Sequence, residues 1–390
     1  MGNFAFLLKT KLYFGENEET RVGEIISSYG FKNVLVLIGG GSIKRDGILD
    51  SIINSLNKEN LNILFYEGIR VNPEFKFVRE RIEEIKNFKP DIVLAVGGGS
   101  VIDTAKSIAA SYFYDGDGFD FNLHKAQPKK SLPIGCILTI SAAGSEMSTS
   151  CVMQDDDLHI KLGFNTELNR PLFAIESPRL TFTVSKTQTA YGIVDILMHT
   201  IERYFSESSD FELCDDLALG LIKSVIKSGE VAHREPDNYD ARANLMLASS
   251  VSHSGFTSIG KTYKMPVHAL EHGVSGLYPH VAHAAGVAVL FPKWARYYIQ
   301  YDVDKFDKFA KEVFNLSIND KMENGLEGIK KIEEYFKSLN MPTNFNDLDI
   351  ENPDIKTLVN IITNNGTRVV GHHVKPMDEN VVSLILENCI

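Results

Sequence analysis

Cysteine is scarce in this chain of 390 residues, and long apolar runs are absent. The four cysteines form no CxxC pair and no dense cluster, which excludes a zinc ribbon and a disulfide framework and is typical of thiols in a reducing cytosol. Near the N-terminus the apolar run Phe4–Leu8 is interrupted by Lys9, so the sequence predicts neither a signal peptide nor a membrane-spanning helix. We therefore expect a cytoplasmic protein.

Positive charge is also in short supply. The chain has 40 lysines and arginines against 51 aspartates and glutamates, which gives a formal net charge of −11. Nucleic acids and anionic membranes are bound through cationic surfaces, so neither is expected as a partner. Because 44% of the residues are apolar and the chain is long for one domain, two domains with separate cores are expected.

The first part of the chain alternates short apolar runs that end in glycine with segments of helical periodicity. The runs are 34–38, 61–66 and 92–96, and the predicted crossover helices lie within 51–60 and 78–88. This alternation is typical of a parallel sheet covered by helices. The sequence therefore predicts an α/β, nucleotide-binding domain at residues 1–183.

After Thr183 nearly every segment has helical periodicity. We therefore expect an all-helical domain at residues 184–390. The predicted helices are Thr187–Phe205, Cys214–Ser228, Tyr239–His253, Pro266–Leu277, Ala285–Ile299, Lys305–Val313, Met322–Leu339, Asp354–Thr363 and Asp378–Glu387.

A glycine-rich turn follows the third apolar run. Residues 91–96 lead into three glycines, then Ser100 and a helical pattern. Glycines let a backbone approach a pyrophosphate closely, and a helix N-terminus adds amide donors and a positive dipole end. Gly97–Ser100 is thus predicted to hold the pyrophosphate of a dinucleotide, although the common GxGxxG pattern is absent.

The end of the first strand bears on which nicotinamide cofactor is used. Gly39–Ser42 stands there, followed by Lys44 and Arg45, and we expect no acidic group that would bind the 2′-hydroxyl of NAD and repel the 2′-phosphate of NADP. The sequence therefore favours NADP(H) over NAD(H). The alternative for Lys44 and Arg45 is an ordinary solvated basic surface.

One carboxylate and three imidazoles have spacings that suit a single metal ion. Asp195 and His199 lie four apart in a predicted helix and so project from one face. His268 lies near the start of another predicted helix, and His283 follows that helix. This donor set suits Fe²⁺ or Zn²⁺ and suits Ca²⁺ or Mg²⁺ poorly.

Four motifs, in this order, resemble the iron-dependent alcohol dehydrogenases, above all the NAD(P)H-using branch that is similar to butanol dehydrogenases. They are GGGSVIDTAK at 97–106, GSE at 144–146, GIVDILMHTIE at 192–202 and HALEHGVSGLYPHVAH at 268–283. The resemblance covers nearly the whole chain. It implies a Rossmann-like N-terminal domain and an all-α metal-binding domain, an architecture shared with dehydroquinate synthases, with the active site in the cleft between them.

By this resemblance Asp195, His199, His268 and His283 match the family's metal ligands. The cofactor contacts expected from the resemblance and from the end of the first strand are Gly39, Gly40, Ser42, Asn72, Gly98, Gly99, Ser100, Asp103, Thr139 and Lys161.

The implied reaction is hydride transfer between NAD(P)(H) and a small aliphatic alcohol or aldehyde such as butanol or butanal. Asp195 and His199 are assigned to catalysis through the metal, which acts as a Lewis acid. His272 lies four residues after His268 on the same helical face and is predicted to relay a proton or contact substrate, with a structural hydrogen bond as the alternative. Glu202 is interpreted as part of a helix-surface ion pair, with a partner of a metal ligand as the alternative.

Three further histidines are assigned more simply. His253 is interpreted as a hydrogen-bonded core residue, and His372 and His373 are candidates for the border of the cleft. The N-terminal segment FAFLLKTKLYF is predicted to be a sheet edge that pairs with its copy in a homodimer.

Two alternatives remain at this point. A zinc polyol dehydrogenase or a dehydroquinate-synthase-like enzyme would share the fold, but a synthase acting on phosphorylated acids should place more arginine and lysine in the second half. A non-catalytic cofactor-binding or metal-storing protein should lack a metal ligand or the glycine turn, and both are present.

Overall fold

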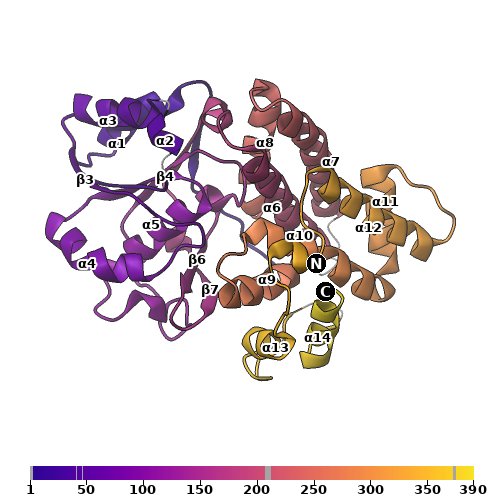
Figure 1. The fold of residues 1–390 in the computed structure, drawn as a ribbon. Coiled ribbons are helices and arrows are strands. Elements are labelled where there is room, and N and C mark those ends of the chain that lie inside the picture. The colour runs from indigo at the N-terminus through magenta and orange to yellow at the C-terminus, as the bar shows by residue number, and fades with distance from the viewer. Residues whose placement is uncertain (1–2, 41, 46, 207–211, 372–374) are drawn as a thin grey trace. The chain divides into compact units, whose positions relative to one another are not determined.

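The structure is a computed structural model that describes residues 3–40, 42–45, 47–206, 212–371 and 375–390 (Figure 1). The chain forms two compact units. The sheet unit comprises Leu7–Ser185 and Glu235–Ser254, and the helical unit comprises Met1–Phe6, Lys186–Arg234 and Gly255–Ile390. The predicted fold class, an α/β domain followed by a helical domain, is confirmed.

The sheet unit contains a six-stranded, fully parallel sheet in the order β1-β8-β5-β4-β2-β3, with β1 and β3 at its edges. The strands are β1 (Lys11–Phe14), β2 (Asn33–Ile38), β3 (Asn62–Tyr66), β4 (Ile92–Gly97), β5 (Ile134–Leu138) and β8 (Phe173–Glu176). A separate antiparallel pair is formed by β6 (Ser150–Asp155) and β7 (Ile160–Asn165).

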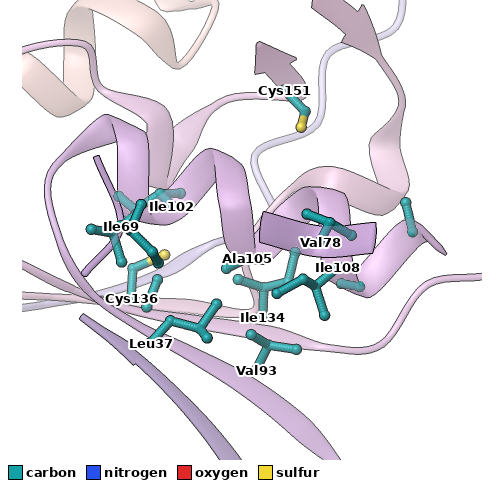
Figure 2. Close-up of a cluster of buried hydrophobic side chains, with 14 of the residues drawn as sticks. Leu37, Ile69, Val78, Val93, Ile102, Ala105, Ile108, Ile134, Cys136 and Cys151 are labelled. Atoms are coloured by element: carbon teal, nitrogen blue, oxygen red, sulfur yellow. The ribbon is translucent and has the colours of Figure 1, made fainter. Parts of the chain in front are cut away.

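Successive residues of the central strands pack on opposite faces of the sheet, which is why β2 and β4 are apolar almost throughout. On one face, Leu37 and Val93 pack with Ile102 and Ile108 of α5 (Figure 2). On the other face, Val36 and neighbouring strand residues pack with apolar side chains of α1 and α3. Helices of the sheet unit are α1 (Val22–Ser28), α2 (Ser42–Arg45), α3 (Ile48–Lys58), α4 (Lys76–Phe88), α5 (Gly99–Ser111) and α8 (Tyr239–His253).

The division between the two units differs from the predicted domains in two segments, the N-terminal residues up to Phe6, which belong to the helical unit, and Glu235–Ser254, which belongs to the sheet unit. The predicted boundary at 183/184 lies close to Ser185, but α8 belongs to the sheet unit. It packs there against the short 3₁₀ helices η3 (Ser145–Met147) and η5 (Pro178–Thr181). Helical periodicity identifies α8 but does not say which core its apolar face covers.

All nine helices predicted after Thr183 are present, one of them (α8) in the sheet unit. The largest difference is in α7, which continues past Ser228 because Gly229 packs against Tyr335 inside the helix instead of ending it. The other eight helices, all in the helical unit, are α6 (Lys186–Tyr204), α7 (Glu212–Arg234), α9 (Pro266–Leu277), α10 (His283–Tyr298), α11 (Val303–Phe314), α12 (Lys321–Ser338), α13 (Ile355–Thr363) and α14 (Glu379–Glu387). Among the described helices, none combines the length and apolar character needed to cross a bilayer.

Candidate metal centre and cofactor site

The four predicted metal ligands come together within the helical unit. Helix α6 supplies Asp195 and His199, α9 supplies His268, and His283 is the first residue of α10. Oδ1 of Asp195 lies 3.1 Å from Nδ1 of His199 and 3.9 Å from Nε2 of both His268 and His283. The imidazole centroids of His199 and His268 are 4.5 Å apart, and those of His268 and His283 are 5.1 Å apart.

Two atoms of this cluster indicate that a cation fits there. Asp195 and His268 are both 6% exposed, and within the described part of the chain Oδ1 of Asp195 and Nε2 of His268 have no hydrogen-bond partner. A buried polar atom left unpaired costs about 1–3 kcal/mol. The 3.9 Å between these two atoms is too long for a hydrogen bond but suits two ligands of one ion.

The electrostatics of the cluster place two of the four predicted ligands, Asp195 and His199, in the protonation state that binds metal. Burial would raise the pKa of Asp195, but the imidazoles of His199, His268 and His283 together hold it well below its usual range. Burial lowers the pKa of His199 to about 4. For His268 burial also acts to lower the pKa, but the carboxylates of Glu202 and Asp195 outweigh it and raise the pKa to about 9. Asp195 is thus ionised and His199 neutral near pH 7, as metal binding requires.

The predicted glycine turn has the expected strand-to-helix setting. Strand β4 ends at Gly97, and α5 begins at Gly99. A Cβ atom on Gly98 would lie 2.5 Å from a methyl group of Ile140, so only glycine fits there without a shift. Thr139 donates its backbone N–H to the carbonyl of Gly97 at 3.2 Å, which places this predicted cofactor residue beside the turn.

Asn72 and Lys161, two further predicted cofactor residues, meet although they lie 89 positions apart in the chain. Nζ of Lys161 donates to Oδ1 of Asn72 at 3.2 Å. A pyrophosphate-sized group therefore has, within the sheet unit, an open helix N-terminus at α5 and an ammonium donor at Lys161 as possible partners.

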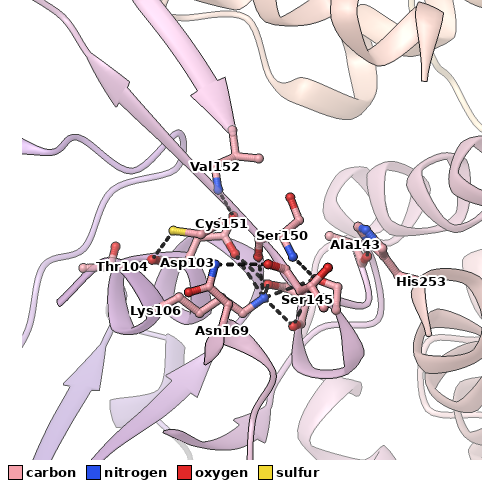
Figure 3. A network of polar contacts seen from close by, with 12 residues as sticks. Asp103, Thr104, Lys106, Ala143, Ser145, Ser150, Cys151, Val152, Asn169 and His253 are labelled. Atoms are coloured by element: carbon pink, nitrogen blue, oxygen red, sulfur yellow. Dashed lines mark hydrogen bonds and ion pairs between the residues drawn. The ribbon is translucent and has the colours of Figure 1, made fainter. Parts of the chain in front are cut away.

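Asp103 lies on the inner side of α5 in a buried network (Figure 3). Its carboxylate accepts hydrogen bonds from Oγ of Ser145 at 2.6 Å and from the backbone N–H of Val152 at 3.0 Å. Lys106, which is 0% exposed, donates to the carbonyls of Ser145 and Ser150 at 2.7 and 2.6 Å. The GSE motif thus anchors the helix that follows the glycine turn, and the predicted contact of Asp103 with cofactor stays a prediction.

The sequence matches two family models that together span most of the chain. Iron-containing alcohol dehydrogenase matches residues 9–178, and the C-terminal domain of the Fe-containing alcohol dehydrogenase family matches residues 189–389. The chain belongs to the iron-containing alcohol dehydrogenase family.

Relatives in this family are similar over nearly their whole lengths. NADH-dependent butanol dehydrogenase A of Clostridium acetobutylicum is 39% identical over 95% of both chains, and the NADPH-dependent aldehyde reductase YqhD of Escherichia coli is 29% identical over 96% of both. The crystal structure of NADH-dependent butanol dehydrogenase A from Thermotoga maritima superposes with a TM-score of 0.96, at 34% identity and covering 100% of this chain and 99% of that one.

These matches make the chain an oxidoreductase, a metal-dependent alcohol dehydrogenase or aldehyde reductase that uses iron or a similar metal and NAD(P). They favour this function over a dehydroquinate-synthase-like or polyol dehydrogenase activity.

Two buried glutamates contact two of the predicted ligand histidines. The carboxylate of Glu202 is 1% exposed and accepts a hydrogen bond from Nδ1 of His268. The interpretation of Glu202 as a helix-surface ion pair is therefore wrong, because α6 is buried on nearly all sides in this region. Glu271, which is 0% exposed, accepts a hydrogen bond from Nδ1 of His283, a contact that sequence reasoning missed.

The other histidines fall into three groups. The ring of His272 is half-buried, with its centroid 5.7 Å from that of His283, so it lies beside a predicted metal ligand, and its catalytic role stays a prediction. Nδ1 of His253 lies 2.6 Å from the carbonyl oxygen of Ala143, in keeping with a structural residue. His372 and His373 lie outside the described residues.

An acidic residue does lie near the end of β2, the strand that the sequence predicts as the first. Lys44 of α2 forms an ion pair with Glu67, the residue that follows β3, and both side chains are about half exposed. The next residue, Gly68, donates its N–H to the carbonyl of Gly39 at 3.2 Å. The expectation that no acidic group is present there is therefore wrong, because the acid comes from the neighbouring strand. Gly41 and the side chain of Ser42 lie outside the described part of the chain.

Proposed function

We propose that the protein reduces small aliphatic aldehydes, such as butanal, and oxidises the corresponding primary alcohols. The observation that carries this proposal is the convergence of Asp195, His199, His268 and His283, in which the buried atoms Oδ1 of Asp195 and Nε2 of His268 have no hydrogen-bond partner among the described residues. Fe²⁺ or Zn²⁺ is the proposed metal because one carboxylate and three imidazoles suit either ion.

The proposed roles divide between the two predicted domains, 1–183 and 184–390. The first would hold the dinucleotide at Gly97–Ser100, with the side chains of Asn72 and Lys161 as further contacts. The second would hold the metal. When bound, the metal supplies a Lewis acid for the substrate oxygen and the nicotinamide supplies or accepts the hydride. His272 is proposed to exchange the proton of the substrate hydroxyl group.

The side chains of the metal centre also make contributions of their own, separate from those of the metal and the cofactor. Asp195 remains ionised, and the imidazole of His199 donates from Nδ1 to the carbonyl of Asp195 at 2.9 Å, which fixes the orientation of its ring. The burial of Asp195, His199 and His268 excludes water from this side of the site.

We test the proposal by following nicotinamide absorbance with butanal after the protein has been stripped of metal and reloaded anaerobically with Fe²⁺ or Zn²⁺. Metal-dependent oxidation of NADPH or NADH is expected, with activity restored at least tenfold above the stripped protein. A protein that binds either metal stoichiometrically, binds the cofactor and still does not turn over butanal, propanal or hexanal would contradict the proposal.

For the cofactor we propose a preference for NADP(H) through Lys44, with Glu67 keeping NAD(H) usable. The ammonium group of Lys44 would attract the 2′-phosphate of NADP, whereas the carboxylate of Glu67 would repel it and can accept a hydrogen bond from the 2′-hydroxyl of NAD. Among the named relatives, butanol dehydrogenase A is NADH-dependent and YqhD is NADPH-dependent, so both cofactors are represented.

Charge changes at these two residues should shift cofactor choice in opposite directions. We expect Glu67→Gln to raise the ratio of kcat/KM for NADPH to that for NADH about tenfold and Lys44→Met to lower it about tenfold, which corresponds to roughly 1.4 kcal/mol for each partly exposed charge. The matched control is Lys86→Met, which removes the surface ion pair with Glu83 on α4 and should leave the ratio unchanged. A ratio that stays within twofold in both Lys44→Met and Glu67→Gln would refute this assignment.

A homodimer and a reducing compartment complete the proposal. Strand β1 lies at an edge of the sheet, and the side chains that precede it, from Phe4 to Leu8, include four apolar groups that are at least 40% exposed. A second copy of the chain would cover them. The four cysteines are all free and buried, as in proteins of the cytoplasm. The acidic net charge gives no basis for a nucleic-acid or membrane partner.

A further inference from the structure

We propose that Glu202 and Glu271 are positioning residues of the metal centre. Each holds a ligand histidine that lies on another helix, and each supplies negative charge that a divalent ion balances. This inference rests on the proposed function, because it assumes that Asp195, His199, His268 and His283 bind a metal. It adds two residues to the site and assigns them a measurable contribution to metal affinity.

Glu202 connects α6 to α9. One carboxylate oxygen accepts the backbone N–H of Val267 at 2.6 Å, and the other accepts Nδ1–H of His268. Because both oxygens are engaged at the start of α9, the carboxylate is fixed in position and the imidazole cannot rotate about its Cβ–Cγ bond without losing the contact. Helix α6 thus contributes two ligands of its own and holds the ligand of α9.

Glu271 connects α9 to α10 in the same way. Its carboxylate accepts Nδ1–H of His283, the first residue of α10. Gly286, one turn further along α10, makes this approach possible: a Cβ atom there would lie 2.8 Å from Cγ of Glu271. Helix α6 therefore carries a glutamate that fixes the ligand histidine of α9, and α9 carries one that fixes the ligand histidine of α10.

These contacts decide which nitrogen faces the ion. Since Nδ1–H of His268 and of His283 is held by a carboxylate, Nε2 is the nitrogen of each ring that is left to bind an ion, and metal binding displaces any proton it carries. The two Nε2 atoms each lie 3.9 Å from Oδ1 of Asp195, on the side where the ligands converge. A carboxylate partner also makes an imidazole a stronger donor to a metal.

The buried charges support the same conclusion. Asp195, Glu202 and Glu271 are carboxylates no more than 6% exposed, and Arg203, 1% exposed, is the buried cation that donates to the carbonyl of His199. Once metal binding has made the imidazoles neutral, these four side chains carry three negative charges and one positive charge, an excess of two negative charges. A divalent ion neutralises this excess, and neutrality lowers the cost of keeping the charges buried.

Cobalt binding tests the inference without any substrate or cofactor. Co²⁺ is titrated into metal-free protein against a chelator, and its absorption spectrum reports the geometry of the ligands. We expect Glu202→Gln and Glu271→Gln each to weaken Co²⁺ affinity about 10–100-fold, the range typical of the loss of a partner to a metal-binding histidine. Glutamine can still accept the Nδ1–H hydrogen bond, so these variants isolate the charge, whereas Glu202→Ala and Glu271→Ala should also alter the spectrum.

The control is Glu333→Gln, a largely buried glutamate of the same unit that pairs with Arg296 and contacts no metal ligand. It should keep wild-type Co²⁺ affinity, and the increase in Tm on adding Co²⁺ should shrink only in the Glu202 and Glu271 variants. Glu202→Gln and Glu271→Gln test the inference independently, so the experiment is decisive even if only one of the two variants folds. Affinity within twofold of wild type in the folded glutamine variants, or equal weakening in Glu333→Gln, would overturn the inference. A failure of the proposed function would appear differently, as wild-type protein that binds Co²⁺ or Fe²⁺ tightly but does not oxidise NAD(P)H.

Discussion

Replacing Asp195 with asparagine should lower kcat/KM for aldehyde reduction at least about a thousandfold. Asp195 is the single carboxylate among the four predicted ligands, and the other three ligands converge on its Oδ1 atom. Asparagine keeps the shape of the side chain but removes the negative charge that binds the ion. Losing the Lewis acid removes several kcal/mol of stabilisation from the transition state, and each 1.4 kcal/mol is a factor of ten in rate.

Steady-state kinetics should be combined with metal analysis of the purified Asp195→Asn protein. We expect less than one-tenth of the wild-type metal content and an unchanged affinity for NAD(P)H, because the predicted dinucleotide contacts belong to the sheet unit. Asp216→Asn is the matched control, since Asp216 is an exposed acid of the helical unit that pairs with Lys308. Retention of a tenth or more of the wild-type kcat/KM by Asp195→Asn would show that this carboxylate does not hold a catalytic metal.

The sequence was sufficient for the parts of this molecule that depend on local patterns. Apolar runs ending in glycine locate β2 and β4, and helical periodicity locates α6 to α14. The four candidate metal ligands could also be proposed, because they lie in the motifs that resemble the family's. Each of these inferences uses residues that are close in the chain or a pattern that repeats at a fixed period.

What the sequence did not reveal depends on which segments become neighbours in space. Glu67 reaches Lys44 only because β3 pairs with β2, and Glu202 and His268 are 66 positions apart but share a hydrogen bond. A glutamate on a helix is usually solvated, and only the burial of α6 on nearly all sides distinguishes Glu202 from that common case. Which core α8 joins is likewise decided by tertiary packing and not by its own periodicity.

Lys106 should be among the residues on which the stability of the sheet unit depends most. Its ammonium group is 0% exposed and donates to the carbonyls of Ser145 and Ser150 and to the hydroxyl groups of Ser145 and Ser148. It also lies 3.8 Å from the carboxylate of Asp103, whose side chain is 15% exposed (Figure 3). Burial lowers the pKa of Lys106, but the negative charge of Asp103 and the surrounding acceptors favour its charged form.

The substitution Lys106→Met keeps most of the side-chain volume but removes the charge and every donor. We expect it to cost about 3–5 kcal/mol, since it leaves the Asp103 carboxylate without its cation and several carbonyl groups without their donor. For a unit of this size that corresponds to a fall in Tm of roughly 6–20 °C, measured by calorimetry or circular dichroism. Lys86→Met, at an exposed lysine of α4, should change Tm by no more than about 1 °C.

A double variant separates the electrostatic part of this loss from the loss of hydrogen bonds. Asp103→Asn removes the negative charge, so the variant Asp103→Asn/Lys106→Met should be more stable than Lys106→Met alone, with a coupling of about 1–3 kcal/mol in the double-mutant cycle. If the two losses simply add, Lys106 stabilises the sheet unit through its hydrogen bonds to Ser145 and Ser150 and not through Asp103. If Lys106→Met alone leaves Tm within 2 °C of wild type, the buried network does not hold α5 in place, and the glycine turn at its N-terminus must be positioned by the packing of Ile102 and Ile108 on the sheet.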